Sequence, residues 1–174
     1  MTAKASFLRS GTATHFLMTS GLMVFFVLWM VVLFSPGHGM AGDQTEFVQV
    51  LESTKSFSET LETFKKEAGK AGWTLLNVNN LAGVLSEHGF TLHPVMTLDV
   101  CKGTYSVPIL SNDEYRPASA FMPCRVSIYK TSDGRVFVAR MNTSVVAKKM
   151  SPKVAEIMSA SDGEIAEIIA KAVR

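Results

Sequence analysis

The stretch Cys124–Met141, CRVSIYKTSDGRVFVARM, decides the fold class of this chain of 174 residues. Apolar and polar residues alternate in Arg125–Tyr129 and again in Val136–Met141, which predicts two strands. Between them, Asp133-Gly134 is typical of a tight turn. The stretch therefore predicts an antiparallel β-hairpin, around which the rest of the domain is expected to form.

The start of this hairpin is marked by Met-Pro-Cys. Pro123 has no backbone N–H to donate, so the first strand is expected to begin directly after it. Cys124, Val126 and Ile128 then share one face of the strand, and Arg125 points to the opposite face. We expect the Cys124 face to be the core face, with the thiol buried where the strand begins.

Upstream of the hairpin, the residue pattern changes from strand to helix and back. Glu46–Glu52 alternates and predicts a strand. A helix follows, because Ser56 and Glu59 form a capping box and apolar residues recur on one face until Gly72. Two further strands are expected at Trp73–Val78 and Thr91–Val100, with a short helix over Asn80–Gly89 between them.

The C-terminal segment has two helix-start signals. Ser151-Pro152 is a cap followed by proline at the first helical position. Ser161–Glu164 is a second capping box, ahead of an apolar stripe. The order is β-α-β-β-β-β-α, with the short helix after the second strand. Strands that are segregated from helices predict an α+β fold, in one compact domain over residues 42–174.

Residues 1–41 differ from this domain in composition. No charged residue occurs from Ser10 to Gly42, and Phe16–Phe34 is almost entirely apolar. Nineteen helical residues span roughly 28 Å, close to the thickness of a bilayer core. The preceding Lys4 and Arg9 favour a cytoplasmic N-terminus. We expect one transmembrane helix in the inner membrane, with residues 42–174 in the periplasm; a signal peptide cleaved after Gly39-Met40-Ala41 is the alternative.

Charge argues against nucleic acid as a partner. Lys4 and Arg9 are the two basic residues of residues 1–41, so the other 15 basic residues balance the 15 acidic residues of the remainder. Nucleic-acid-binding domains usually carry a basic excess. The expected contact of this chain is membrane lipid, through Phe16–Phe34.

Three stretches of the domain resemble a known family, the domain of unknown function 302 family of bacteria and archaea. They are FSETLETFKKEAGKAGW, LDVCKGTYSVPIL and MPCRVSIYKTSDGRVFVARMN. Pro-Cys before this hairpin is the family's usual signature. The resemblance implies a compact α+β domain with a mainly antiparallel sheet, and no activity is established for the family. Lys102-Gly103 stands where members often have Asn or Lys-Pro after the first cysteine.

Cys101 and Cys124 permit several interpretations. They could be two buried apolar groups, a disulfide, a working thiol pair, or metal ligands. A disulfide would stabilise the fold by roughly 3 kcal/mol on the chain-entropy model. A reactive thiol needs a nearby cation to lower its pKa, and Arg125 should point away from Cys124. The usual CxxC motif is absent.

Two histidines, His88 and His93, are further candidate ligands. Together with Cys101 and Cys124 they would suit copper or haem iron, because soft sulfur and imidazole ligands favour these metals. No CxxCH motif for covalent haem occurs, and the histidines are not spaced as a pair on one helix. No cofactor is predicted from these residues.

The chain also lacks the motifs of common enzymes, since it has no glycine-rich phosphate loop, GxSxG or HExxH. The favoured hypothesis is a non-enzymatic, membrane-anchored periplasmic binding or accessory subunit of a larger membrane complex. The alternatives are a periplasmic thiol protein that handles redox or sulfur compounds through Cys101 and Cys124, and a metal- or haem-binding domain.

Overall fold

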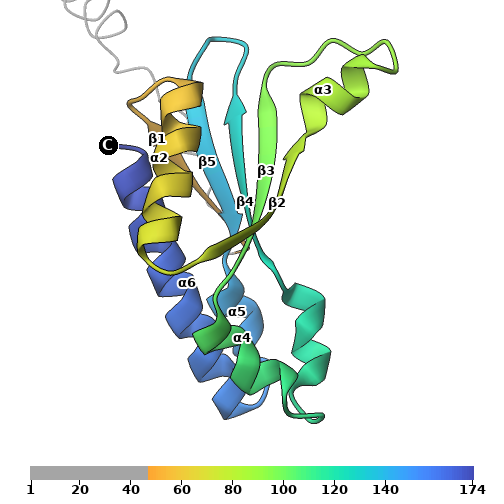
Figure 1. Cartoon of the computed structure of the whole chain (residues 1–174), viewed down its shortest axis with the longest axis vertical. Coiled ribbons are helices and arrows are strands. Elements are labelled where there is room, and N and C mark those ends of the chain that lie inside the picture. Colours follow the sequence, from red (N-terminus) through yellow and green to blue (C-terminus); the bar gives the residue numbers. More distant parts are fainter. Residues whose placement is uncertain (1–46) are drawn as a thin grey trace, which may run out of the picture. The chain divides into compact units, whose positions relative to one another are not determined.

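A computed structural model of the chain describes residues 47–174. These residues form one five-stranded sheet in the order β1-β5-β4-β3-β2, and every neighbouring pair is antiparallel (Figure 1). The predicted α+β domain with an antiparallel sheet is therefore confirmed. The strands are β1 (Val48–Ser53), β2 (Thr74–Asn80), β3 (Val95–Cys101), β4 (Cys124–Lys130) and β5 (Val136–Met141).

Helices cover one face of this sheet and both of its ends. The long helices α2 and α6 lie side by side against one face, while α4 and α5 lie at the end where β3 stops and α3 lies at the opposite end (Figure 1). The helical elements are α2 (Phe57–Lys70), α3 (Leu81–Ser86), α4 (Gly103–Leu110), the 3-10 helix η1 (Arg116–Phe121), α5 (Thr143–Ala147) and α6 (Pro152–Ala172).

The β4–β5 hairpin forms as its sequence predicts. Lys130 pairs with Val136, and Gly134 has the positive φ of 90° that favours glycine in a tight turn. The Asp133 carboxylate accepts hydrogen bonds from the Thr131 hydroxyl and from the Arg135 guanidinium, at 2.7 Å for the latter. The turn is thus fixed by local hydrogen bonds as well as by backbone conformation.

Helix α2 also begins and ends as predicted. The Ser56 hydroxyl accepts a hydrogen bond from the Glu59 N–H, and the Glu59 carboxylate accepts one from the Ser56 N–H, at 3.0 Å. These two bonds satisfy backbone donors that the first helical turn leaves without partners. Gly72, just after the helix, has φ 78°.

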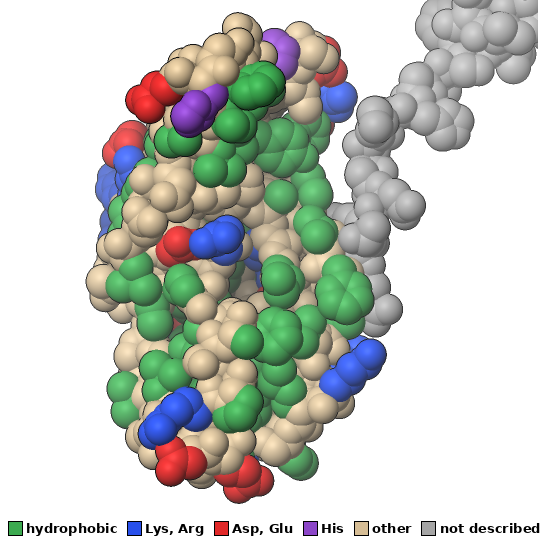
Figure 2. Space-filling model, turned by 90° about the vertical axis from the view of Figure 1, so that its right-hand side faces the viewer, with side chains coloured by type: hydrophobic (Ala, Val, Ile, Leu, Met, Phe, Trp, Pro, Cys, Tyr) green, Lys and Arg blue, Asp and Glu red, His purple; other side chains and the backbone are tan. Residues whose placement is uncertain are grey.

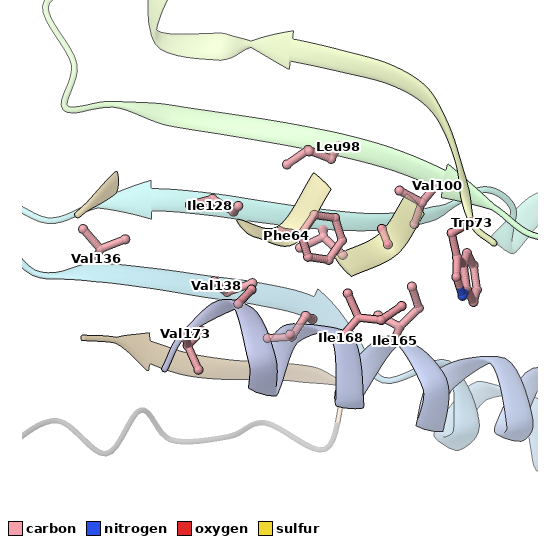
Figure 3. Close-up of a cluster of buried hydrophobic side chains, with 14 residues drawn as sticks. Phe64, Trp73, Leu98, Val100, Ile128, Val136, Val138, Ile165, Ile168 and Val173 are labelled. Carbon is pink, nitrogen blue, oxygen red and sulfur yellow. The ribbon is translucent and has the colours of Figure 1, made fainter. Parts of the chain in front are cut away.

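The main core lies between the sheet and helices α2 and α6 (Figure 3). Val126 and Ile128 of β4 are fully buried there, which confirms the predicted core face of the hairpin. Phe64 of α2 and Ile169 of α6 contact the same cluster, and Cys124 packs against it at the start of β4. The strand alternation read from the sequence therefore sets which hairpin side chains reach the helices.

The second helix start, predicted at Ser161–Glu164, is wrong, because α6 runs unbroken from Pro152 to Ala172. Ser161 lies inside the helix, and its hydroxyl donates to the Met158 carbonyl oxygen at 3.0 Å instead of capping a new turn. The buried side of α6 continues across this position, from Ile157, which packs with residues of α4 and α5, to Ile165 in the main core, so tertiary packing carries the helix through the capping signal.

Two regions of helix were missed by the sequence prediction. The segment between β3 and β4 contains α4 and η1, and α5 follows β5 directly. Proline inside α4, at Pro108, and proline at the first turn of η1 obscure the helical pattern of this segment.

The predicted transmembrane helix, Phe16–Phe34, lies outside the described residues, as do residues 1–46 as a whole. Within residues 47–174, no helix has both the length and the hydropathy needed to span a bilayer.

Candidate functional site

The two cysteines lie at the same end of the sheet, on adjacent strands. Cys101 is the last residue of β3 and Cys124 is the first residue of β4. Because these strands are antiparallel, Val100 pairs with Cys124, and Cys101 follows one position later. Both cysteines are half-buried free thiols, so the disulfide, one of the interpretations left open by the sequence, is not supported.

Both cysteines line one small cavity of about 30 Å³. The ends of β3 and β4 form one side of it, and helices α4 and α6 with the end of η1 close the others. A cavity of this size holds about one or two water molecules and is far below the volume of an organic ligand site. The other lining residues are Trp73, Val100, Lys102, Tyr105, Ser106, Ile109, Phe121, Met122, Pro123, Thr143, Ile157, Met158 and Ser161.

Cys101 is held by the first turn of α4. Its thiol donates to the Ser106 hydroxyl oxygen at 3.4 Å, and that hydroxyl donates to the Lys102 carbonyl oxygen at 2.9 Å. Ser106 is buried, so this chain of hydrogen bonds orients the thiol from within the cavity wall. The helix that sequence analysis missed thus positions one of the two predicted site residues.

Cys124 is a protonated thiol at neutral pH. Burial raises its pKa above the ordinary value, and the Ser161 hydroxyl and the Arg140 guanidinium only partly offset this effect. As predicted, Arg125 points to the opposite face, where its guanidinium forms a two-pronged ion pair with the Asp99 carboxylate, at 2.7 and 3.1 Å. Arg125 is therefore not an activator of the thiol.

An ion pair lies at the rim of the cavity, between α4 and α6. Lys102 Nζ is 2.6 Å from Glu164 Oε1 and 5.6 Å from the centre of the Tyr105 ring. Burial acts to raise the pKa of Glu164, but hydrogen bonds from Lys102 and Tyr105 outweigh it, so this pKa is lowered. The hydrogen bond to Glu164 raises the pKa of Tyr105. The rim is thus occupied by the ion pair of Lys102 and Glu164.

A second, buried ion pair lies on the other side of Cys124 and was not predicted. The Arg140 guanidinium of β5 donates to the Asp162 carboxylate of α6 and to the Gln49 side chain of β1. The backbone N–H and the hydroxyl of Thr143 also donate to Asp162, each at 3.2 Å. These groups border a second cavity of about 50 Å³, which Cys124 also lines.

The alternation of residues along β5 indicates that Arg140 is buried and therefore needs a charged partner. Val136, Val138 and Arg140 share one face of β5, and the first two face the core. A charged residue in register with core valines predicts a buried partner, because an unpaired buried charge is strongly destabilising. The identity of that partner, Asp162, depends on how α6 packs.

The structure does not bring the candidate histidines to the cysteines. His88 and His93 lie in the connection between α3 and β3, and Figure 1 shows α3 and α4 at opposite ends of the sheet. Within residues 47–174, no three side chains of the types His, Cys, Asp and Glu form a group that could hold a metal ion. A site combining His88 or His93 with Cys101 and Cys124 does not form in this fold.

The chemistry available at the cavity is that of sulfur. Among the described residues that line it, none is a carboxylate or an imidazole. The lining does contain the Lys102 amine and the Tyr105 hydroxyl besides the sulfur atoms.

Large apolar side chains are exposed on the open face of the sheet and at the end of the sheet opposite to the two cysteines. Figure 2 shows hydrophobic side chains spread over that face, which has a hollow in it. Phe47, Val48 and Met141 line a shallow depression of about 290 Å³ there. At the other end, the segment from α3 to β3 exposes Leu81, Val84, Leu85, Phe90 and Leu92, with Phe90 60% exposed.

Comparison with known proteins places the fold. The family model described as "Domain of unknown function DUF302" matches residues 49–172. A crystal structure of the uncharacterized conserved protein DUF302 from Bacillus stearothermophilus has a TM-score of 0.67 and 20% identity, with 75% of this chain and 100% of that chain covered. This likeness shows a shared fold. No curated protein matches the chain.

Proposed function

We propose that this chain, which belongs to the DUF302 family of domains of unknown function, is a non-enzymatic binding protein that holds a small thiophilic ligand between Cys101 and Cys124. The observation that carries the proposal is the shared cavity. Two thiols from different strands border one space, and three helical segments enclose it. Thiophilic ligands are sulfur compounds or soft metal ions that form bonds to thiolate.

The protonated state of the Cys124 thiol favours binding over catalysis. The raised pKa keeps Cys124 protonated and weakly nucleophilic in the resting protein. A ligand that bonds to sulfur displaces this proton, so the thiol becomes a donor when the ligand arrives. Such a site reacts only slowly with electrophiles while it is empty.

Simple packing accounts less well for the same residues. A packed core leaves few voids larger than a water molecule. Here the space that both thiols border is open, and polar groups from Lys102, Ser106 and Ser161 border it as well.

We also propose that Phe16–Phe34 anchors the chain in the inner membrane, with the cavity on the periplasmic side, where ligands from outside the cell arrive.

Alkylation of the native protein tests this function. The full-length reduced chain is treated with iodoacetamide, which is small, and in parallel with a maleimide carrying a polyethylene glycol chain. We expect the small reagent to label both cysteines slowly and the large reagent to label them only after denaturation. Intact mass reports the number of labels, and Cys101→Ser and Cys124→Ser each remove one. Thiols that resist iodoacetamide until the chain is unfolded would show that the cavity is closed packing.

A second candidate function is supported by the exposed apolar residues after β2. Five large apolar side chains between Leu81 and Leu92 are exposed together, and solvent-exposed clusters of this kind mark interaction sites. We propose that this surface docks the chain, as an accessory subunit, on a membrane protein complex. Sedimentation of the detergent-extracted native protein should give a particle larger than the monomer, and the double variant Phe90→Ser, Leu92→Ser should reduce it to the monomer. A native protein that sediments as a monomer would rule this role out.

A further inference from the structure

Four sulfur-bearing residues, distant in the sequence, line the cavity together. The two thiols, Cys101 and Cys124, are joined by the thioethers Met122 and Met158. Cys101 ends β3, Met122 and Cys124 flank Pro123 at the start of β4, and Met158 comes from α6. Helix packing thus gathers two thiols and two thioethers around one space of about 30 Å³.

From this set of donors we infer that the cavity is a copper(I) site, with Cys101 and Cys124 as thiolate ligands and Met122 and Met158 as thioether ligands. The inference rests on the proposed function, because it names the thiophilic ligand of the same cavity. Thiolate and thioether ligands together select monovalent copper over the common divalent metals.

The composition of the wall argues against other metals. Magnesium and calcium require oxygen ligands, and zinc takes Cys, His, Asp or Glu but not thioether in its usual sites. Among the described lining residues none is Asp, Glu or His. The cavity is also far too small for a porphyrin. Monovalent copper needs as few as two sulfur ligands, so the donors present are sufficient for it.

Protons and charge are conserved when copper binds. Two thiols and one Cu⁺ give a bis-thiolate complex with one net negative charge and two released protons, and copper keeps its oxidation state. The Met122 and Met158 thioethers are neutral donors. Lys102 lines the cavity beside this complex and is paired with Glu164 at the rim, and Arg140 and Asp162 form a second ion pair near Cys124.

Competition with a chromogenic copper(I) chelator tests the site. The full-length chain, fully reduced and without oxygen, is titrated with Cu(I) in the presence of bathocuproine disulfonate. We expect one copper ion per chain to be withheld from the chelator. Cys101→Ser and Cys124→Ser should each abolish retention, and Met158→Leu should weaken it by about tenfold, as loss of a supporting ligand does in other metal sites.

Met141→Leu is the matched control, because Met141 is exposed on the sheet and does not line this cavity. Its copper affinity should equal that of the natural chain. Far-UV circular dichroism checks that each variant is folded.

A second experiment uses the natural chain without substitutions. One equivalent of Ag(I), which has the same preference for sulfur, should protect both cysteines from iodoacetamide.

The outcomes separate this inference from the proposed function. If iodoacetamide labels both native thiols but the folded chain withholds no copper, the copper site is wrong and the cavity binds another thiophilic ligand. If the serine variants retain copper as the natural chain does, the ion is bound elsewhere and the site is likewise wrong. If the native thiols cannot be labelled and no copper is withheld, both the site and the proposed function fall.

Discussion

The two ends of the sheet are built differently, although the same strands run between them. Where β3 stops and β4 starts, α4, η1 and α6 enclose the thiols and a buried ion pair. At the opposite end, α3 and the segment after it leave large apolar side chains in solvent, and the hairpin turn is fixed by local hydrogen bonds. One end therefore depends on long-range packing, and the other depends on contacts between sequence neighbours.

This difference predicts where substitutions are costly. The cysteine end should lose stability when a single buried partner is removed. The α3 end should tolerate substitution in the isolated protein, because its side chains have little packing to lose. The first two experiments compare a change at one end with a matched change at the other, and the last two follow the pH dependence of one group at each end.

The largest effect is expected from Asp162→Ala. This substitution leaves the buried Arg140 guanidinium without its carboxylate and should lower the free energy of unfolding by about 3–5 kcal/mol. The control is Glu52→Ala at the hairpin end, where the pair with Arg135 is half-exposed and 3.6 Å long, so the loss should be about 0–1 kcal/mol. Urea denaturation measures both. Equal losses would contradict the proposed contrast between the ends.

A smaller effect is expected from truncating an apolar side chain. Ile109 of α4 is 2% exposed and lines the sulfur cavity, so Ile109→Ala should lower the free energy of unfolding by about 2–4 kcal/mol. Leu92→Ala at the other end should change it by less than about 0.5 kcal/mol, because this side chain is 49% exposed. A large loss for Leu92→Ala would show that the α3 end is packed in solution.

The thiol Cys124 gives a pH dependence at the cysteine end. Burial raises its folded pKa above the ordinary 9.0, so the folded protein holds this proton more tightly than the unfolded chain does. Stability should therefore be unaffected by this group below pH 9 and should fall as the pH rises beyond it. Thermal unfolding between pH 8 and 10 should show a shallower fall for Cys124→Ser. Parallel curves for the two proteins would contradict the assignment.

The smallest effect is expected at the hairpin turn. Hydrogen bonds from Thr131 and Arg135 lower the pKa of Asp133 from 3.8 to about 2. The stabilisation from this carboxylate is present above pH 3.8 and is lost as the pH falls toward 2. Asp133→Asn should remove only this small, acid-dependent part of the free energy of unfolding. Urea denaturation between pH 2 and 5 measures it. Asp133 is fully exposed, so no change at neutral pH comparable to that of Asp162→Ala is expected.

The same contrast between local and long-range contacts explains which elements of the fold could be predicted from the sequence. The hairpin, α2 and the core face of β4 were predicted because each depends on residues close in sequence, such as Asp133-Gly134 and the capping box of Ser56 and Glu59. The break predicted at Ser161 was wrong, because packing of α6 against the sheet overrides a local capping signal.

The candidate site was predicted only in part. The sequence drew attention to Cys101 and Cys124 and placed Cys124 at the buried start of a strand. It left open whether the two residues meet, and it grouped them with His88 and His93, which lie at the other end of the sheet. Met122 stood near the cysteines in the sequence, whereas Met158 and Asp162 had no local pattern that linked them to the site.

By itself, the sequence determined the α+β class, the antiparallel hairpin and the face on which Cys124 lies, since turn chemistry and two-residue alternation act between near neighbours. The tertiary structure alone decided that β3 and β4 are adjacent, that α4 and α6 close the space between their ends, and that two thioethers and a buried ion pair meet two thiols there. These groups lie up to 61 positions apart in the sequence, from Cys101 to Asp162, and burial of the shared core fixes them.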